Sequence, residues 1–315
     1  MATDARGTGT LLAAFEAEPA LGRPRGLWTD AWRRLRKNRL AMFGLFMLVV
    51  IALIAFVGAH AGPFGRYAPN DQNYAAGARQ AGPSMQHWFG TDQLGRDLFA
   101  RVLEGVRISI EIGLGTQVIV LVIGLLVGGG AALGGRFFDN LLMRVTDITY
   151  AFPDLLAIIL VRSILVDRTW PVVTNPRVLI ILAIALVSWT TVARLIRGQM
   201  LSLAERDFVL AARALGAPRW RVVFQHMLPN TLSPVIVAIT FGVPTAIFAE
   251  AALGFIGLGI PPPAASLGTL VSQGYAYIEN NVWNVVFPAG AVALLMLCFT
   301  FLGDGLRDAL DPRTR

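Results

Sequence analysis

Long apolar segments separated by short polar ones dominate the chain. Six of them are long enough to cross a bilayer as a helix, because about 20 residues at about 1.5 Å per residue cover roughly 30 Å of hydrocarbon. They lie at 40–59, 108–133, 142–166, 178–197, 231–256 and 282–301. With 55% hydrophobic and only 15% charged residues among 315, the chain is too apolar for a soluble domain of this size. We predict an all-α integral membrane protein with six transmembrane helices.

The basic residues predict the orientation of these helices. Of the 27 Lys and Arg residues, 19 lie in segments that a six-helix layout places on the side of the N-terminus, and eight lie on the other side. Because positively charged loops stay in the cytoplasm, both termini are predicted to be cytoplasmic. The basic residues are spread over several loops and do not share one face, so the net charge of +7 does not indicate a nucleic-acid partner.

The layout divides the chain into five regions. A disordered cytoplasmic leader is expected at 1–27, and an interfacial segment plus the first transmembrane helix at 28–60. An extracytoplasmic loop is expected at 61–106, the remaining transmembrane domain at 107–308, and a cytoplasmic tail at 309–315. Within the transmembrane domain we expect a short turn at 134–140, an outside loop at 259–282, and a fifth helix interrupted by Pro234 and Pro244.

A basic segment at 205–230, between the fourth and fifth apolar runs, is predicted to form two short helices. Asp207 is the expected N-cap of the first, which carries Phe208, Ala211, Ala212 and Leu215 on one face. Gly216 suits the left-handed position after that helix. Pro218 suits the first turn of the second helix, at 219–227, which is expected to stop before Leu228 and Pro229. An ordinary cytoplasmic hairpin and a docking surface both fit this pattern.

A second distinctive stretch, 89–101, lies in the expected extracytoplasmic loop. Its pattern predicts a turn at Gly90, an N-cap at Thr91 or Asp92, and a short helix carrying Arg96 and Asp97. The simpler alternative is a surface helix whose charges are solvated.

Two acidic residues within or near the apolar runs are candidate path or gate residues. Asp154 follows Pro153 in the third run, and Glu250 lies near the outer end of the fifth. Acidic groups at membrane depth usually face a cavity or a partner helix, because exposure to lipid is costly.

No pattern for enzyme chemistry is found in the sequence. The three histidines, at 60, 87 and 226, fall on different sides of the predicted membrane, and Cys298 is the only cysteine. The single lysine, Lys37, is followed by Asn38, so the chain lacks a P-loop. We therefore expect no catalytic residues, no bound cofactor and no metal.

The 205–230 segment resembles the "EAA" loop of ABC importer permeases. The resemblance rests on Ala211-Ala212, Gly216 four residues later, and Leu228-Pro229. The sequence departs from the general pattern at Leu210, where Glu is usual, and at His226, where an aliphatic residue is usual.

The 89–101 stretch is more specific for substrate class. Its residues Gly90, Thr91, Asp92, Gly95, Arg96 and Asp97 resemble the signature of the C-type permeases of dipeptide, oligopeptide and nickel importers. The strings at 139–153, 249–263 and 303–312 are similar to the same branch, so the resemblance covers roughly residues 28–312.

The resemblance implies a type I ABC importer permease architecture in a bacterial or archaeal cytoplasmic membrane. It further implies a heterodimer with a second permease subunit, two ABC ATPase subunits that use ATP and Mg, and an extracytoplasmic substrate-binding protein. The residues it assigns to ATPase coupling are Asp207, Ala211, Ala212, Leu215, Gly216, Leu228 and Pro229. The expected cargo is a di- or oligopeptide; nickel or another small solute in the same type of complex, and an ATP-independent carrier, are the alternatives.

Overall fold

The computed structural model describes residues 27–58, 62–166 and 174–311. The expected leader, apart from Leu27, and the last four residues of the expected tail lie outside the described residues. The described part is mostly helical, and its only extended pairing is an isolated bridge between Thr91 and Asp97.

The helices follow one another along the chain with short connections, except for one long loop between η2 and α4. They are α2 (Leu27–Leu35), α3 (Arg39–Phe56), a 3₁₀ turn η2 (Gly62–Gly65), α4 (Leu98–Leu133), α5 (Gly135–Ala151), α6 (Asp154–Val166), α7 (Pro176–Ala204), α8 (Asp207–Ala214), α9 (Arg219–Arg221), a π-helical turn η3 (Val222–Met227), α10 (Leu228–Phe255), α11 (Leu267–Tyr275) and α12 (Trp283–Leu310).

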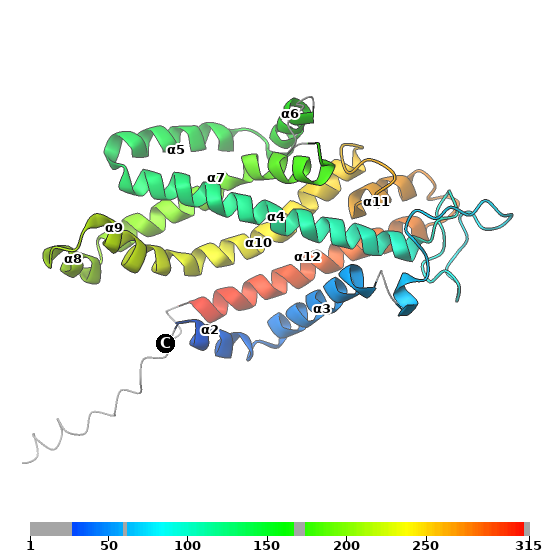
Figure 1. Ribbon diagram of the computed structural model, residues 1–315, viewed down its shortest axis with the longest axis horizontal. Helices are drawn as coiled ribbons and strands as arrows, with labels where there is room; N and C mark the ends of the chain where they lie inside the picture. Colours follow the sequence, from blue (N-terminus) through cyan, green and yellow to red (C-terminus); the bar gives the residue numbers. More distant parts are fainter. Residues whose placement is uncertain (1–26, 59–61, 167–173, 312–315) are drawn as a thin grey trace, which may run out of the picture.

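The long helices lie side by side in an elongated bundle (Figure 1). One end carries the loop 66–97 and α11, and we call it the loop end. The opposite end, the α8 end, carries α8, α9, the turn between α4 and α5, the start of α3 and the end of α12. Segments that the charge pattern places on one side of the membrane thus lie together at one end of the bundle.

The contact between α4 and α7 is the most extensive in the bundle. Gly124 and Gly128 of α4 face Val192, Ala193 and Ile196 of α7 so closely that an added Cβ atom would overlap with them. Small residues permit such close approach, and between membrane helices this van der Waals packing replaces much of the hydrophobic driving force. A cluster of buried apolar side chains extends from this contact towards the α8 end, where side chains of α7 meet those of α8, η3 and α10.

Two ion pairs hold α5 against α7. Arg197 donates to both carboxylate oxygens of Asp139, at 2.5 and 2.7 Å, and Arg194 donates to Asp147 at 2.9 Å. The Arg194 guanidinium also lies 4.2 Å from the ring centre of Tyr150. These contacts bind α5 to the helix that leads directly into the 205–230 segment.

Among the residues that the structure describes, five helices are long and apolar enough to cross a membrane, and α5 with α6 makes a sixth only if this bent pair is counted as one span. The prediction of one helix over 142–166 is wrong, because α5 and α6 meet at an angle of 98°. Pro153 explains the break: the residue before a proline is pushed out of helical geometry, and Phe152 is extended.

Other predicted boundaries also change. The second run starts at Leu98, not at 108, and the expected turn at 134–140 is mostly the first part of α5. The expected outside loop at 259–282 contains α11, and α12 runs on to Leu310. The interruption expected at Pro234 and Pro244 does not occur, since α10 is continuous through both.

The α4–α7 contact predicts that alanine substitutions at two neighbouring glycines will differ in their effect on stability. Gly128→Ala should lower the free energy of unfolding by about 1–3 kcal/mol, because its Cβ overlaps with the Ala193 carbonyl oxygen, a backbone atom that cannot rotate away. Gly129→Ala is the control, since its Cβ would lie 3.8 Å from the Met200 sulfur. It should be neutral or stabilising by up to about 1 kcal/mol. Equal thermal unfolding midpoints for the two variants in detergent would contradict this packing.

Candidate functional site

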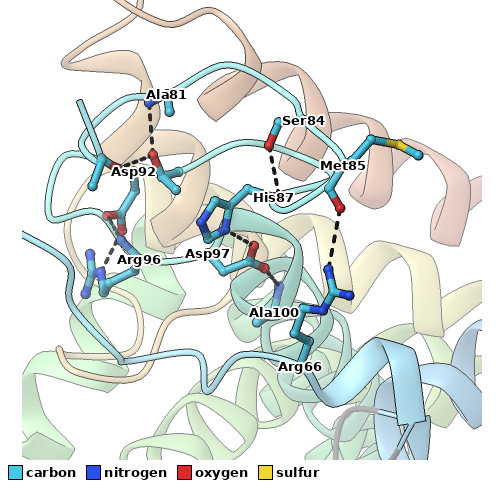
Figure 2. A network of polar contacts seen from close by, with 11 residues as sticks. Arg66, Ala81, Ser84, Met85, His87, Asp92, Arg96, Asp97 and Ala100 are labelled. Carbon is cyan, nitrogen blue, oxygen red and sulfur yellow. Dashed lines mark hydrogen bonds and ion pairs between the residues drawn. The ribbon is translucent and has the colours of Figure 1, made fainter. Parts of the chain in front are cut away.

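The first candidate site is a network of polar groups at the loop end. Figure 2 shows Asp92, Arg96 and Asp97 of the signature stretch within it, and all three side chains are buried. The stretch 91–97 does not form the predicted short helix. It forms a tight turn closed by hydrogen bonds from Asp92 N–H to the Arg96 carbonyl and from Gly95 N–H to the Asp92 carbonyl, both 3.0 Å. The turn delivers the chain directly into α4.

Asp92 organises this turn. Its Oδ1 accepts from the backbone N–H groups of Leu94 and Arg96 at 2.8 and 3.0 Å, and its Oδ2 accepts from Arg96 Nε at 2.6 Å. Arg101 Nε lies 3.6 Å from the same Oδ2, and its side chain is fully buried. The alternative of a surface helix with solvated charges is therefore wrong: these groups are buried, and their mutual pairing offsets the cost of desolvation.

Thr91, Gly90 and Gly95 allow neighbouring segments of the loop to lie close together. Thr91 Oγ1 donates to the Ala78 carbonyl at 2.7 Å and accepts from Ala81 N–H at 2.9 Å. Gly90 and Gly95 have φ values of +83° and +71°. A Cβ at either would overlap with a carbonyl oxygen of a neighbouring loop segment. Only glycine fits both the backbone angle and the close approach.

Asp97 is the N-cap of α4, a role that the sequence prediction gave to Thr91 or Asp92 for a different helix. Its Oδ1 accepts from Ala100 N–H at 2.7 Å, and its Oδ2 lies 2.8 Å from His87 Nδ1. The His87 ring stacks on Tyr67, with ring centres 4.6 Å apart. One carboxylate thus starts a 36-residue helix and ties the preceding loop to it.

Sequence reasoning missed three members of this network: His87, Arg101 and Asn281. Asn281 Nδ2 donates to the carbonyls of Gln80 and Ala81 at 3.3 and 3.2 Å, and so ties the loop to the connection between α11 and α12. Neither this contact nor the Arg101–Asp92 pair follows a helical or strand period, so no pattern in the sequence could have indicated them.

The second candidate site is the 205–230 segment at the α8 end. Gly216 is left-handed, with φ +78°, as predicted. Gly216 N–H donates to the Arg213 carbonyl at 2.9 Å and Ala217 N–H to the Ala212 carbonyl at 3.0 Å, which is the bonding pattern of a Schellman cap. These bonds turn the chain sharply from α8 towards α9.

Two predicted details of this segment are wrong. The N-cap of α8 is Arg206, and Asp207 is the first residue inside the helix, where its charge suits the helix dipole without a capping bond. Pro218 is the N-cap of α9 and lies outside the helix. The predicted face of Phe208, Ala211, Ala212 and Leu215 is mostly exposed, and Val209 is the buried residue of α8.

The second helix does not stop before Leu228 and Pro229. It passes through the π-helical turn η3 into α10, so residues 219–255 form one continuous helical rod. In a regular α-helix the Pro229 ring would clash with the carbonyl group four residues earlier. The wider π turn moves that carbonyl group away from the ring. Asn230 Nδ2 donates to the His226 carbonyl at 2.6 Å, which gives a partner to one backbone group there.

Several large apolar side chains of this segment are exposed at its outer surface. Its exposed large apolar residues are Phe208, Leu210, Leu215, Trp220 and Phe224. Leu215 is 88% exposed. Exposed arginines at 206, 213, 219 and 221 alternate with these side chains along the segment. Exposed apolar groups rimmed by charges are typical of a protein–protein docking surface.

The structure does not bring the two candidate path residues together. Asp154 is exposed at the bend between α5 and α6. Glu250 is completely buried in α10, and its Oε2 accepts from Ser109 Oγ of α4 at 3.1 Å. Among the described residues, no group of three His, Cys, Asp or Glu side chains is arranged to hold a metal ion.

Solved structures share this fold. A chain of the MetNI methionine ABC transporter, solved in inward-facing conformations, aligns with a TM-score of 0.54 over 67% of this chain and 96% of that chain, at 20% sequence identity. A second crystal form of the same transporter gives a TM-score of 0.55. The shared fold, together with the family match given next, places the protein in the class of ABC importer permeases, which are membrane-embedded transport subunits and not enzymes.

The chain belongs to the family described as "Binding-protein-dependent transport system inner membrane component", which matches residues 121–315. Residues 26–83 match a second family, "N-terminal TM domain of oligopeptide transport permease C". The oligopeptide transport system permease protein OppC of Bacillus subtilis is 42% identical over 96% of this chain and 95% of its own length. The dipeptide transport system permease protein DppC of the same organism is 41% identical over 91% of this chain and 86% of its own length.

The Asp92 network predicts that a single change will loosen the whole loop. Asp92→Asn places an amide opposite Arg96 and leaves two buried arginines without their carboxylate, so we expect a loss of about 3–5 kcal/mol of local stability. Limited proteolysis with an arginine-specific protease should then cut the loop at the exposed Arg79 much faster than in the wild type. Asp71→Asn, in an exposed part of the same loop, should leave the rate unchanged. Equal cleavage rates for the two variants would contradict a central role for Asp92.

Proposed function

We propose that the chain is the C-type permease subunit of an ATP-driven, binding-protein-dependent importer of di- or oligopeptides. The observation that carries this proposal is the similarity to two peptide permeases at 41–42% identity over more than nine-tenths of the chain. In this proposal the protein lies in a bacterial or archaeal cytoplasmic membrane, with the α8 end and both termini in the cytoplasm and the loop end outside.

The 205–230 segment is proposed to dock on an ATPase subunit. The exposed apolar side chains, among them Leu215, and the exposed arginines of the same segment support this assignment. Ala211 and Ala212 allow close approach of the partner, Gly216 sets the angle between α8 and α9, and Leu228 and Pro229 lie where the segment enters α10. Asp207 is proposed to stabilise the first turn of α8. ATP and Mg are bound by the two ATPase subunits.

The continuous rod 219–255 supplies a mechanical link for this role. Because no loop interrupts the rod, a displacement of its α9 end is transmitted through α10 towards the loop end, where Glu250 contacts α4. We propose that closure of the ATPase subunits moves the rod, and that α10 then shifts against α4 to open the outer side of the path. Asp154 and Glu250 are proposed gate residues in this movement.

The loop end is proposed to receive the substrate-binding protein. The buried network of Thr91, Asp92, Arg96 and Asp97 supports this assignment, because it makes the loop a rigid platform. The exposed outer surface of α5 is proposed to contact a second permease subunit, which completes the path.

Reconstitution tests the proposed function. The complex, purified with its partners and placed in proteoliposomes, should take up radiolabelled di- and tripeptides only when ATP and the loaded binding protein are present. Peptide uptake without ATP would favour a carrier, and nickel uptake in place of peptide uptake would overturn the proposed cargo.

Leu215→Asp tests the docking surface. Because Leu215 is 88% exposed, the change should not affect folding, but it would bury a charge in the proposed interface and should reduce co-purifying ATPase at least about tenfold. Met85→Asp, at a side chain that is 90% exposed at the loop end, is the matched control and should retain the ATPase. Quantitative mass spectrometry of the purified complexes measures both. Retention of ATPase by Leu215→Asp would contradict the assignment.

Gly216→Pro tests coupling. Proline cannot adopt φ +78° and lacks the N–H group that bonds to Arg213, so the angle between α8 and α9 should change. We expect ATP hydrolysis to persist while uptake falls by about tenfold or more. Gly216→Asn is the control, because asparagine tolerates left-handed geometry. Normal uptake by the proline variant would show that this angle does not carry coupling.

A further inference from the structure

A cavity of about 720 Å³ lies at the loop end, between α6, the start of α7 and the region of α10 and α11. Figure 1 shows α6 beside the start of α7, further towards this end of the bundle than α5. The volume is within the range of about 300–1,000 Å³ that small-molecule sites usually have. Leu179, Ile260 and Pro261 give the lining an apolar part.

Arg162 of α6 is the one charged side chain among the described residues that line this cavity. In the described part of the chain its guanidinium has no ion pair or hydrogen bond, and its Nε is buried without a partner. Two buried or half-buried arginines towards the loop end have carboxylate partners: Arg96 pairs with Asp92, and Arg177 with Glu111. A cation in an apolar helix is costly unless it is paired, so an unpaired one facing a cavity usually serves a function.

A second helix that lines the cavity supplies another donor. Gln273 of α11 lines the cavity, and its Oε1 accepts from Arg101 Nη2 at 3.2 Å. Since this bond occupies the amide oxygen, the amide NH₂ group is the part left for a ligand. Arg101 is therefore a positioning residue, and it is the same buried arginine that faces Asp92 in the loop network.

The cavity thus combines a guanidinium and an amide donor with an apolar surface, and none of its described lining residues is acidic. A carboxylate matches this set, because arginine binds carboxylates through two parallel hydrogen bonds. We infer that this cavity binds a carboxylate of the transported peptide, with Arg162 as its cation and the Gln273 amide as a second donor. The inference rests on the proposed peptide-import function and adds the group of the substrate that this chain recognises.

Uptake by the complete complex in proteoliposomes of neutral lipid tests the inference. The probes are trialanine with a free carboxylate and trialanine amide. Arg162→Gln should lower trialanine uptake by about tenfold, which corresponds to the loss of one charge-assisted contact, and should leave uptake of the amide unchanged. Arg162→Lys should retain part of the activity, because the charge remains. Ser163→Ala is the matched control, since Ser163 is exposed and bonds only to the Ile159 carbonyl of its own helix.

The binding protein must deliver trialanine amide for the uptake comparison to work. A photocrosslinking measurement tests the inference even if this delivery fails. Val166 lines the cavity one turn after Arg162 and is exposed, so a benzoylphenylalanine there should not disturb packing. It should crosslink trialanine in the complex, and Arg162→Gln should reduce the yield by about tenfold. In the complex that retains Arg162, trialanine amide should give a crosslinking yield as low as that of trialanine in the Arg162→Gln variant.

The other outcomes are distinct. Equal losses for both probes, or none, would overturn the inference while leaving peptide import intact. A loss that occurs only in vesicles containing anionic lipid would mean that Arg162 binds a lipid phosphate, which also overturns it. Absence of peptide uptake by the wild-type complex would overturn the proposed function itself, and the inference would fall with it.

Discussion

The close contact between α4 and α7 is the constraint on which the rest of the structure depends. Its glycines allow the two backbones to approach without an intervening layer of side chains, which matters where lipid offers no hydrophobic force to drive helices together. α4 begins at the loop-end network and α7 ends at the 205–230 segment. The one contact therefore holds both candidate sites in a common frame.

The two sites differ in how firmly they are held. At the loop end, Asp92 and Asp97 each use both carboxylate oxygens within the protein, so the loop is rigid without a partner. At the α8 end, α8 is attached by Val209 and a glycine turn, and it leaves large apolar side chains exposed. A rigid platform suits repeated docking of a separate protein, whereas an exposed apolar hairpin gains its full burial only in a complex.

Arg101 links the loop end to the interior. It lies against Asp92 on one side and donates to Gln273 on the other, so the signature stretch and the cavity share a buried side chain. The rod 219–255 approaches the same region from the opposite end, where Glu250 meets Ser109 of α4. In the proposed mechanism, movement at the α8 end and a ligand in the cavity would therefore act on the same part of the bundle.

The sequence by itself determined the fold class, most of the membrane-crossing segments, the left-handed Gly216 and the position of the signature residues. These follow from local causes: hydrocarbon length, the backbone freedom of glycine and motif spacing. It did not predict the 98° break after α5, the continuity of the rod through Pro229, or the burial of Asp92 and Arg96. Nor did it place Asn281 on the loop, Val209 in the core, or Arg162 and Gln273 in one cavity. Only the tertiary structure decided these features, because each depends on groups far apart in the chain or on a helix geometry that responds to its neighbours.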